Sequence, residues 1–281
     1  LRLPNQLFYA RYRSGEYIEM EDNLILQMPL FHPRYKKWKK YGYTKRDEKE
    51  NLTEVLEESS GGYCMYCYTR IRVDGKLYAH LEHAIEKSNS EKLKECIPNI
   101  GIACPRCNQS LKKAGERKRK LPSEIIENYE KESRCSLEKR KQCTVACKAL
   151  RRLQKACCNN CEGKIILQPM GVKGEDTGQP LALQYDILHM EFQPAKDRYT
   201  YSDAEKEFIE AHIRRFRLND PVYKTRGIYE FIKNVINGNG VMPEYEYNNW
   251  IVDKFREQLS GKSREEILKI CESIFKIIFR I

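Results

Sequence analysis

Apolar residues recur every three or four positions from residue 202 onward, which is the period of a helix that buries one face. This pattern predicts four helices, which span residues 202–217, 221–237, 244–260 and 263–279. Ser202 and Ser263 are each followed three residues later by a glutamate, the reciprocal capping arrangement that satisfies free N–H groups at a helix start. We therefore expect the C-terminal portion of the chain to be mostly helical.

Earlier in the chain, stretches with the two-residue period of strands appear between helical ones. Alternation predicts strands at residues 71–83, 165–167 and 181–192. The first of these turns at Asp74-Gly75, a dipeptide typical of a hairpin. Helical spacing predicts further helices at residues 51–60, 123–132 and 139–156. The sequence therefore predicts an α+β protein.

The composition is that of a folded protein without a membrane span. Hydrophobic residues make up 41% and aromatic residues 10% of the chain, which argues against wholesale disorder. No apolar run approaches the roughly 20 residues that a membrane span requires. Residues 1–20 lack the apolar core of a secretory signal. We expect a cytoplasmic protein that does not associate with membranes.

The net charge of +11 is concentrated in two segments. Residues 34–46 hold seven basic and no acidic residues among four aromatic ones, and residues 108–156 hold 15 basic and 6 acidic residues. Clustered lysine and arginine release counterions from phosphate backbones, and aromatic side chains can stack on bases. These segments predict nucleic-acid-binding surfaces. The alternative is ordinary solvated lysine beside half-buried tyrosine.

Cysteine accounts for 12 residues, and without a secretory signal a disulfide framework is not expected. Two C-x-x-C pairs are formed by Cys64, Cys67, Cys104 and Cys107. Four thiolates on two such turns give the tetrahedral sulfur cage that suits a structural Zn²⁺. The 36 residues between the pairs exceed the spacing of an ordinary zinc ribbon, so a further element must be inserted there.

A second group of cysteines lies in the basic segment. Its most economical zinc-binding set is Cys143, Cys147, Cys158 and Cys161, with Cys157 able to replace Cys158. The alternative is a group of buried or redox-sensitive thiols. The sequence does not decide between these two interpretations.

The insert between the first two pairs carries the residues of a known motif. Glu82-His83 and Asn99, followed by Asn108 directly after the last cysteine, resemble the motif of HNH endonucleases. The resemblance covers residues 61–114. It implies a ββα-metal fold, in which a hairpin, a metal-binding loop and a helix form the nuclease core.

The same resemblance implies roles for individual residues. His83 would be the general base, Glu82 and Asn108 the ligands of a catalytic Mg²⁺ or Mn²⁺, and Asn99 the residue that holds the loop bearing His83. Such a set suits phosphodiester hydrolysis, which needs a base for the attacking water and a cation for the developing charge. Phosphate contacts are expected from the basic residues around the predicted helix, Arg106, Lys112 and Lys113.

A narrower resemblance extends over the order of motifs along the chain. It is to the PtuB-like HNH components of Septu-type and retron-associated antiphage systems, which implies a defence role beside an ATPase of the SMC/ABC type. DNA is the favoured substrate. The alternatives are cleavage of RNA or tRNA, and a zinc-ribbon subunit that binds nucleic acid without cleaving it.

Four consecutive segments follow from these patterns. They are a basic and aromatic N-terminal segment (1–46), a nuclease core (47–120), a basic cysteine-rich insert (121–164), and strands followed by helices (165–281). The mixed charges of the last segment suit docking to a protein partner or an ordinary scaffold.

Overall fold

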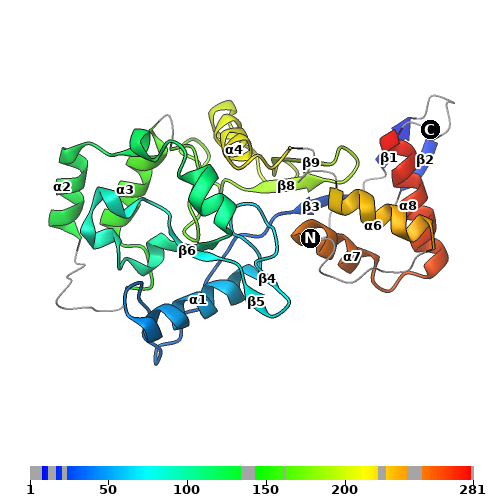
Figure 1. The fold of residues 1–281 in the computed structure, drawn as a ribbon. Coiled ribbons are helices and arrows are strands. Elements are labelled where there is room, and N and C mark those ends of the chain that lie inside the picture. The colour runs from blue at the N-terminus through cyan, green and yellow to red at the C-terminus, as the bar shows by residue number, and fades with distance from the viewer. Residues whose placement is uncertain are drawn as a thin grey trace. The chain divides into compact units, whose positions relative to one another are not determined.

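The computed structural model describes residues 8–11, 17–20, 24–133, 143–160, 163–220, 226–238 and 249–279. The chain forms two compact units, each assembled from separated stretches of sequence. The first unit consists of Leu1–Met28, Leu183–Gln193 and Leu218–Ile281, and the second of Pro29–Ala182 and Pro194–Arg217. Helices and small sheets occur together, as Figure 1 shows, so the predicted α+β class is confirmed.

In its described residues, the first unit combines short strands with three helices. Its strands are β1 (Phe8–Arg11), β2 (Tyr17–Met20), β3 (Ile25–Gln27), β8 (Leu183–Asp186) and β9 (Glu191–Pro194). β1 pairs with β2, and the other three form a sheet in the order β3-β8-β9. The helices are α6 (Arg226–Ile236), α7 (Trp250–Leu259) and α8 (Arg264–Phe279). α6 packs against both α7 and α8, with the rings of Phe231 and Phe255 5.7 Å apart.

The second unit contains both C-x-x-C pairs. Its helices are α1 (Arg46–Ser60), α2 (Ser123–Glu132), α3 (Lys148–Cys158), α4 (Asp203–Phe216) and a π-helix (Arg106–Lys112). Its strands are β4 (Arg72–Val73), β5 (Lys76–Leu77), β6 (His80–His83) and β7 (Ile100–Ala103). β4 pairs with β5 and β6 with β7, all antiparallel. The core of the unit includes Leu52 and Leu56, which have no exposed surface.

The two helix starts that the sequence marks with a capping serine agree with prediction. Ser202 Oγ accepts from the backbone N–H of Glu205 (3.2 Å), and Ser263 Oγ accepts from that of Glu266 (3.2 Å), so α4 and α8 begin as expected. α7 begins later than predicted because Asn249 is its cap and accepts from Val252 N (3.0 Å). The predicted starts at residues 221, 244 and 139 lie outside the described residues.

Three predicted strand regions differ from the structure. The Asp74-Gly75 hairpin exists but is only β4 and β5, and the strand bearing Glu82 pairs instead with β7. The predicted strand at 181–192 is divided into β8 and β9 by a turn. Residues 165–167 are buried but form no strand. A short apolar run predicts that a segment is buried, but it does not show which groups form hydrogen bonds with its backbone.

The backbone of that buried run is satisfied by a histidine. His212 on α4 is 1% exposed, and its Nδ1 accepts from the N–H of Ile166 (3.0 Å). Its ring also packs against that of Phe216, with centroids 4.7 Å apart. Burial lowers the pKa of His212 from 6.5 to about 3, so the ring is neutral in the folded protein.

We expect His212 to make the protein less stable in acid. The unfolded chain takes up a proton below about pH 6.5, whereas folded His212 does so only near pH 3, so stability falls as pH drops through this window. Between pH 6.5 and pH 5 the loss is about 2 kcal/mol. Urea unfolding at both pH values measures it. His212→Gln should flatten the pH dependence, whereas His32→Gln, at an exposed position, should not; equal slopes for all three proteins would contradict the assignment.

Candidate metal centre and catalytic pocket

The first C-x-x-C pair lies on a tight turn that is closed by backbone hydrogen bonds. Tyr63 and Arg70 form a β-bridge, and the N–H of Tyr68 donates to the carbonyl of Cys64 (2.9 Å). Tyr68 has a φ of 61°, in the left-handed region, which brings the chain back toward the bridge. The N–H of Met65 donates to the carbonyl of Ile102 on β7 (3.1 Å), so this turn is attached to the strand that leads to the second pair.

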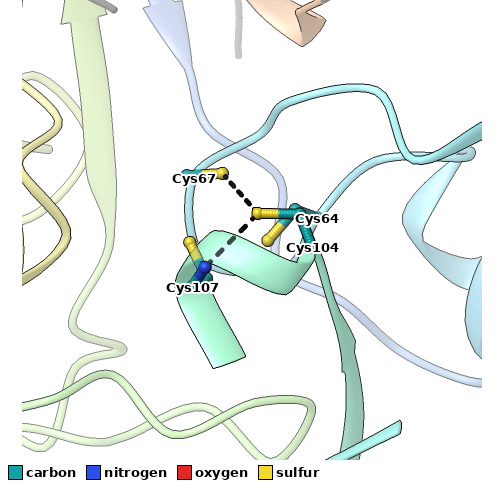
Figure 2. A group of neighbouring side chains, drawn as sticks. All are labelled: Cys64, Cys67, Cys104 and Cys107. Carbon is teal, nitrogen blue, oxygen red and sulfur yellow. Dashed lines mark hydrogen bonds between the residues drawn. The ribbon is translucent and has the colours of Figure 1, made fainter. Parts of the chain in front are cut away.

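Four sulfur atoms converge between this turn and the start of the π-helix (Figure 2). The sulfurs of Cys64, Cys67, Cys104 and Cys107 all lie within 4.8 Å of one another. The Sγ atoms of Cys67 and Cys104 are 3.7 Å apart. In a tetrahedral Zn–S₄ site with bonds of about 2.3 Å the sulfurs are about 3.8 Å apart. The four cysteines are therefore placed to hold a metal ion such as zinc.

The surroundings of the cluster suit a closed, structural site. Cys64 and Cys107 have no exposed surface. Burial raises the pKa of the Cys64 thiol, so a neighbouring cation is needed for it to be a thiolate at neutral pH. Four protein sulfurs also complete a tetrahedral shell, which leaves no position for water or substrate. A Zn²⁺ ion here would join the first turn to the end of β7.

The second group of cysteines does not form such a cluster among the described residues. Cys143 Sγ donates to the carbonyl of Val145 (3.0 Å), and Cys147 Sγ accepts from the N–H of Leu150 (3.4 Å) as the cap of α3. Neither belongs with Cys158 to a group close enough to share an ion. Cys161 lies outside the described residues. The second zinc site stays a prediction.

Two paired strands precede the second C-x-x-C pair, and a helix begins within it. β6 pairs antiparallel with β7 in a register that places Glu82 opposite Gly101 and His83 opposite Ile100. β7 ends one residue before Cys104, and the π-helix then carries Asn108. A π-helix has one extra residue in its turn and often occurs at functional sites. The adjacent Glu82 and His83 are thus brought together with Asn108, which is distant in sequence, at one end of this arrangement.

Asn99 holds the chain that follows His83. It is fully buried, its Oδ1 accepts from the N–H of Ile85 (2.9 Å), and its Nδ2 donates to the carbonyl of Ile85 (2.8 Å). Its own carbonyl accepts from Ala84 N (2.7 Å). Three hydrogen bonds therefore fix the two residues after His83, which limits how far the imidazole can move.

His83 is buried, with 8% of its surface exposed. Its Nε2 lies 3.0 Å from the carbonyl oxygen of Lys94, which can only accept, so Nε2 carries the proton and Nδ1 the lone pair. The ring packs edge-on against Tyr43, with centroids 4.6 Å apart. Burial lowers the pKa of His83, and the imidazole is therefore neutral and able to accept a proton at pH 7.

Glu82 is 4% exposed, and both of its oxygens have partners. The hydroxyl of Tyr66 donates to Oε2 (2.5 Å), and Lys112 Nζ lies 2.5 Å from Oε1. Burial raises the pKa of Tyr66, so its hydroxyl stays protonated and serves as the donor. Lys112 is itself 3% exposed and also donates to the carbonyl of His83 (2.7 Å). The ammonium group of Lys112 is therefore buried and engaged by protein groups, and its contact with phosphate stays a prediction.

A second buried carboxylate completes the charged group. Glu86 is 8% exposed, and its Oε1 accepts from Arg119 Nε (2.8 Å) and lies 3.4 Å from Lys112 Nζ. Its Oε2 is buried without a hydrogen-bond partner. Two acids and two bases, Glu82, Glu86, Lys112 and Arg119, thus form a buried quartet of zero net charge.

These residues surround a cavity of about 230 Å³. Its lining includes Glu82, His83 and Glu86, with Asn108 and Lys113 nearer the solvent. Arg106 is not among the lining residues. Asn99 supports the cavity from behind without lining it. The cavity therefore gathers three of the four residues of the predicted catalytic set, together with one exposed lysine that can reach an anion.

The oxygen atoms that line the cavity suit a hard divalent cation only in part. The carboxylates and the Asn108 amide are the oxygen ligands that Mg²⁺ prefers. The unpartnered Oε2 of Glu86 is an available acceptor. Glu82 does not fit as a ligand while Lys112 lies 2.5 Å away, since a divalent ion about 4 Å from an ammonium group is repelled by about 8 kcal/mol at an effective dielectric constant near 20.

A larger cavity of about 960 Å³ lies elsewhere in the second unit. Arg151, Lys155, Lys164 and Lys173 are among its lining residues, but it contains none of the predicted catalytic set. Its carboxylate Glu205 is already engaged by the backbone N–H and hydroxyl of Thr177. The residues of the predicted catalytic set therefore line the smaller cavity and not the larger one.

Several residues that line the pocket or contact its side chains could not be predicted from the sequence. Glu86 and Arg119 have no motif that marks them, and Tyr66 is hidden inside the first C-x-x-C pair. Tyr43, whose ring packs against His83, differs from these three residues because it belongs to the basic and aromatic segment that the sequence singles out.

Comparison with protein-family models, with curated proteins and with solved structures finds no match for this chain. Among the described residues, none of the helices combines the length and the apolar character needed to cross a bilayer. The fold and the site thus define an α+β protein with a four-cysteine cluster placed to bind a metal ion such as zinc.

Proposed function

We propose that this protein is a metal-dependent endonuclease of the HNH type that hydrolyses phosphodiester bonds. The observation that carries the proposal is the position of His83, neutral, fixed by Asn99 and open to a cavity that Asn108 and Lys113 also line. Two antiparallel strands and a π-helix around it support the proposal, since the resemblance to HNH endonucleases implies a hairpin and a helix.

The roles of the chain's own groups follow from this geometry. His83 Nδ1 takes the proton of the attacking water, while Nε2 remains bound to the Lys94 carbonyl and keeps the ring oriented. Lys113, exposed at the cavity, attracts the phosphate. Asn108 and Glu86 are the residues able to hold Mg²⁺ or Mn²⁺ here, joined by Glu82 if Lys112 withdraws. A bound ion would supply the positive charge that stabilises the leaving oxygen.

Substrate and partner follow from the resemblance rather than from the site. DNA is the favoured substrate, and a role as the nuclease effector of an antiphage complex with an SMC/ABC-type ATPase is part of the same proposal. RNA or tRNA cleavage is the second candidate, because a base and a metal ion acting on a phosphodiester do not distinguish the sugars. A zinc module that binds nucleic acid without cleavage is the third.

The test is cleavage of plasmid DNA and of tRNA in Mg²⁺ or Mn²⁺, with and without the candidate ATPase. His83→Ala should lower the rate by about 10²- to 10⁴-fold, the usual contribution of a general base, while binding persists. His80→Ala is the matched control, since His80 is on the same strand but outside the cavity lining. The metal dependence is best tested by omitting Mg²⁺, because chelators also remove zinc.

The outcomes separate the candidates. Equal rates for His83→Ala and the wild type would contradict the role of His83. Binding without cleavage under every metal and partner condition would favour the non-catalytic zinc module.

A further inference from the structure

The turn at residues 36–39 presents the most exposed large apolar side chain among the described residues. Trp38 is 80% exposed. A single exposed apolar side chain is common on protein surfaces and indicates nothing by itself. The way this turn is held and the charge around it are the observations that indicate a ligand.

The turn is fixed at both ends by the protein behind it. The N–H of Lys36 donates to the hydroxyl of the buried Tyr41 (2.8 Å), and the N–H of Lys39 donates to the carbonyl of Lys36 (3.2 Å). Asn51 Nδ2 on α1 donates to the carbonyl of Lys40 (3.0 Å). The indole of Trp38 is therefore held out in solvent by a preorganised backbone, which reduces the entropy lost on binding.

The surroundings of Trp38 are strongly positive. The side chains of Arg34, Lys36, Lys37 and Lys40 are exposed, and no acidic residue occurs between residues 34 and 46. Of Lys36, Lys37, Lys39 and Lys40, only Lys39 forms an ion pair in the described part of the chain, with Glu54 at 2.5 Å. A flat aromatic surface inside a cationic one is complementary to a nucleic acid with accessible base faces.

We propose that Trp38 is a stacking platform for an unpaired base of single-stranded nucleic acid, whose phosphates are held by the surrounding lysines and Arg34. In a duplex the base faces are covered by their neighbours, so only a single-stranded or flipped segment offers a face to the indole. A membrane surface fits less well, because interfacial binding needs a broad apolar face and this turn offers one side chain.

The platform lies close to the pocket of the proposed nuclease. Tyr43, five residues after Trp38, packs on His83, and five residues of chain span at most about 18 Å. The inference rests on the proposed function for its biological meaning: the substrate would have unpaired bases near the cleaved phosphodiester. Binding itself is independent of cleavage, so the two proposals can fail separately.

Tryptophan fluorescence tests the inference directly, since the chain has only two tryptophans. The full-length, zinc-loaded protein carrying His83→Ala and Trp250→Phe leaves Trp38 as the only reporter and prevents cleavage. Titration with a single-stranded oligonucleotide should quench the fluorescence. The same sequence as a duplex, heparin and anionic phosphatidylserine vesicles should not, even where they bind.

Substitution distinguishes stacking from a general apolar contact. Trp38→Leu should weaken single-strand binding by about 5- to 150-fold, the range found for loss of one base–aromatic stack, while Trp38→Phe should retain most of the affinity. Lys37→Ala should weaken binding of all polyanions alike. Unchanged single-strand affinity in Trp38→Leu would overturn the proposal, as would equal quenching by duplex or by vesicles.

Discussion

Replacing Cys104 with serine is expected to remove zinc and to unfold the second unit around it. Structural zinc in zinc-finger peptides contributes about 10–16 kcal/mol at neutral pH, as much as or more than the net stability of a typical domain. The sulfur of Cys104 lies 3.7 Å from that of Cys67 in the cluster shown in Figure 2. Metal analysis and thermal unfolding measure the two effects together.

Cys143→Ser is the matched control for this substitution. Cys143 is half-buried and belongs to no metal-binding group among the described residues, so its loss should leave the unfolding temperature nearly unchanged. The same experiment counts the ions: one zinc per chain would leave the second site without support, and two would favour it. A Cys104→Ser protein with normal zinc content and stability would contradict the structural role of the cluster.

Replacing Lys112 with methionine is expected to lower the free energy of unfolding by about 3–5 kcal/mol. This is the usual loss when one partner of a buried ion pair is removed and the other stays buried and unpaired. The ammonium group of Lys112 lies 2.5 Å from Glu82 Oε1 and 3.4 Å from Glu86 Oε1, so both carboxylates would lose this partner. Lys113→Met, one position along and exposed, should change stability by less than about 0.5 kcal/mol.

The same variant measures competition between Lys112 and a divalent ion. Without the ammonium group, Glu82 and Glu86 become available as ligands, so Mn²⁺ should raise the unfolding temperature of Lys112→Met more than that of the wild type. Equal stability of the Lys112 and Lys113 variants would show that the quartet is not buried in solution.

A structural feature can be predicted from the sequence when the residues that determine it are close together along the chain. The caps of α4 and α8 could be predicted because Ser and Glu three residues apart interact within one helical turn. The four cysteines could be predicted because each pair forms its own turn. The pairing of β6 with β7 could not, since short 3₁₀ turns separate them and nothing in the spacing names the partner strand.

Other features depended on contacts between distant positions. Lys112 lies among basic residues typical of a surface, and only the fold shows that it turns inward to Glu82. Asn99 was marked by the motif, whereas Glu86 and Arg119 meet only after folding, 33 positions apart. The first unit combines stretches from both ends of the chain, which a change of composition along the sequence does not reveal.

Tyr66 connects the four-cysteine cluster to the pocket that contains His83. It lies between Cys64 and Cys67 in sequence, and its hydroxyl donates to Glu82. An oxidant or a chelator that attacks the sulfurs would therefore disturb the carboxylate beside His83 without entering the pocket. In this protein the redox state of the cell and the supply of zinc would reach the proposed catalytic residues in part through one phenol group.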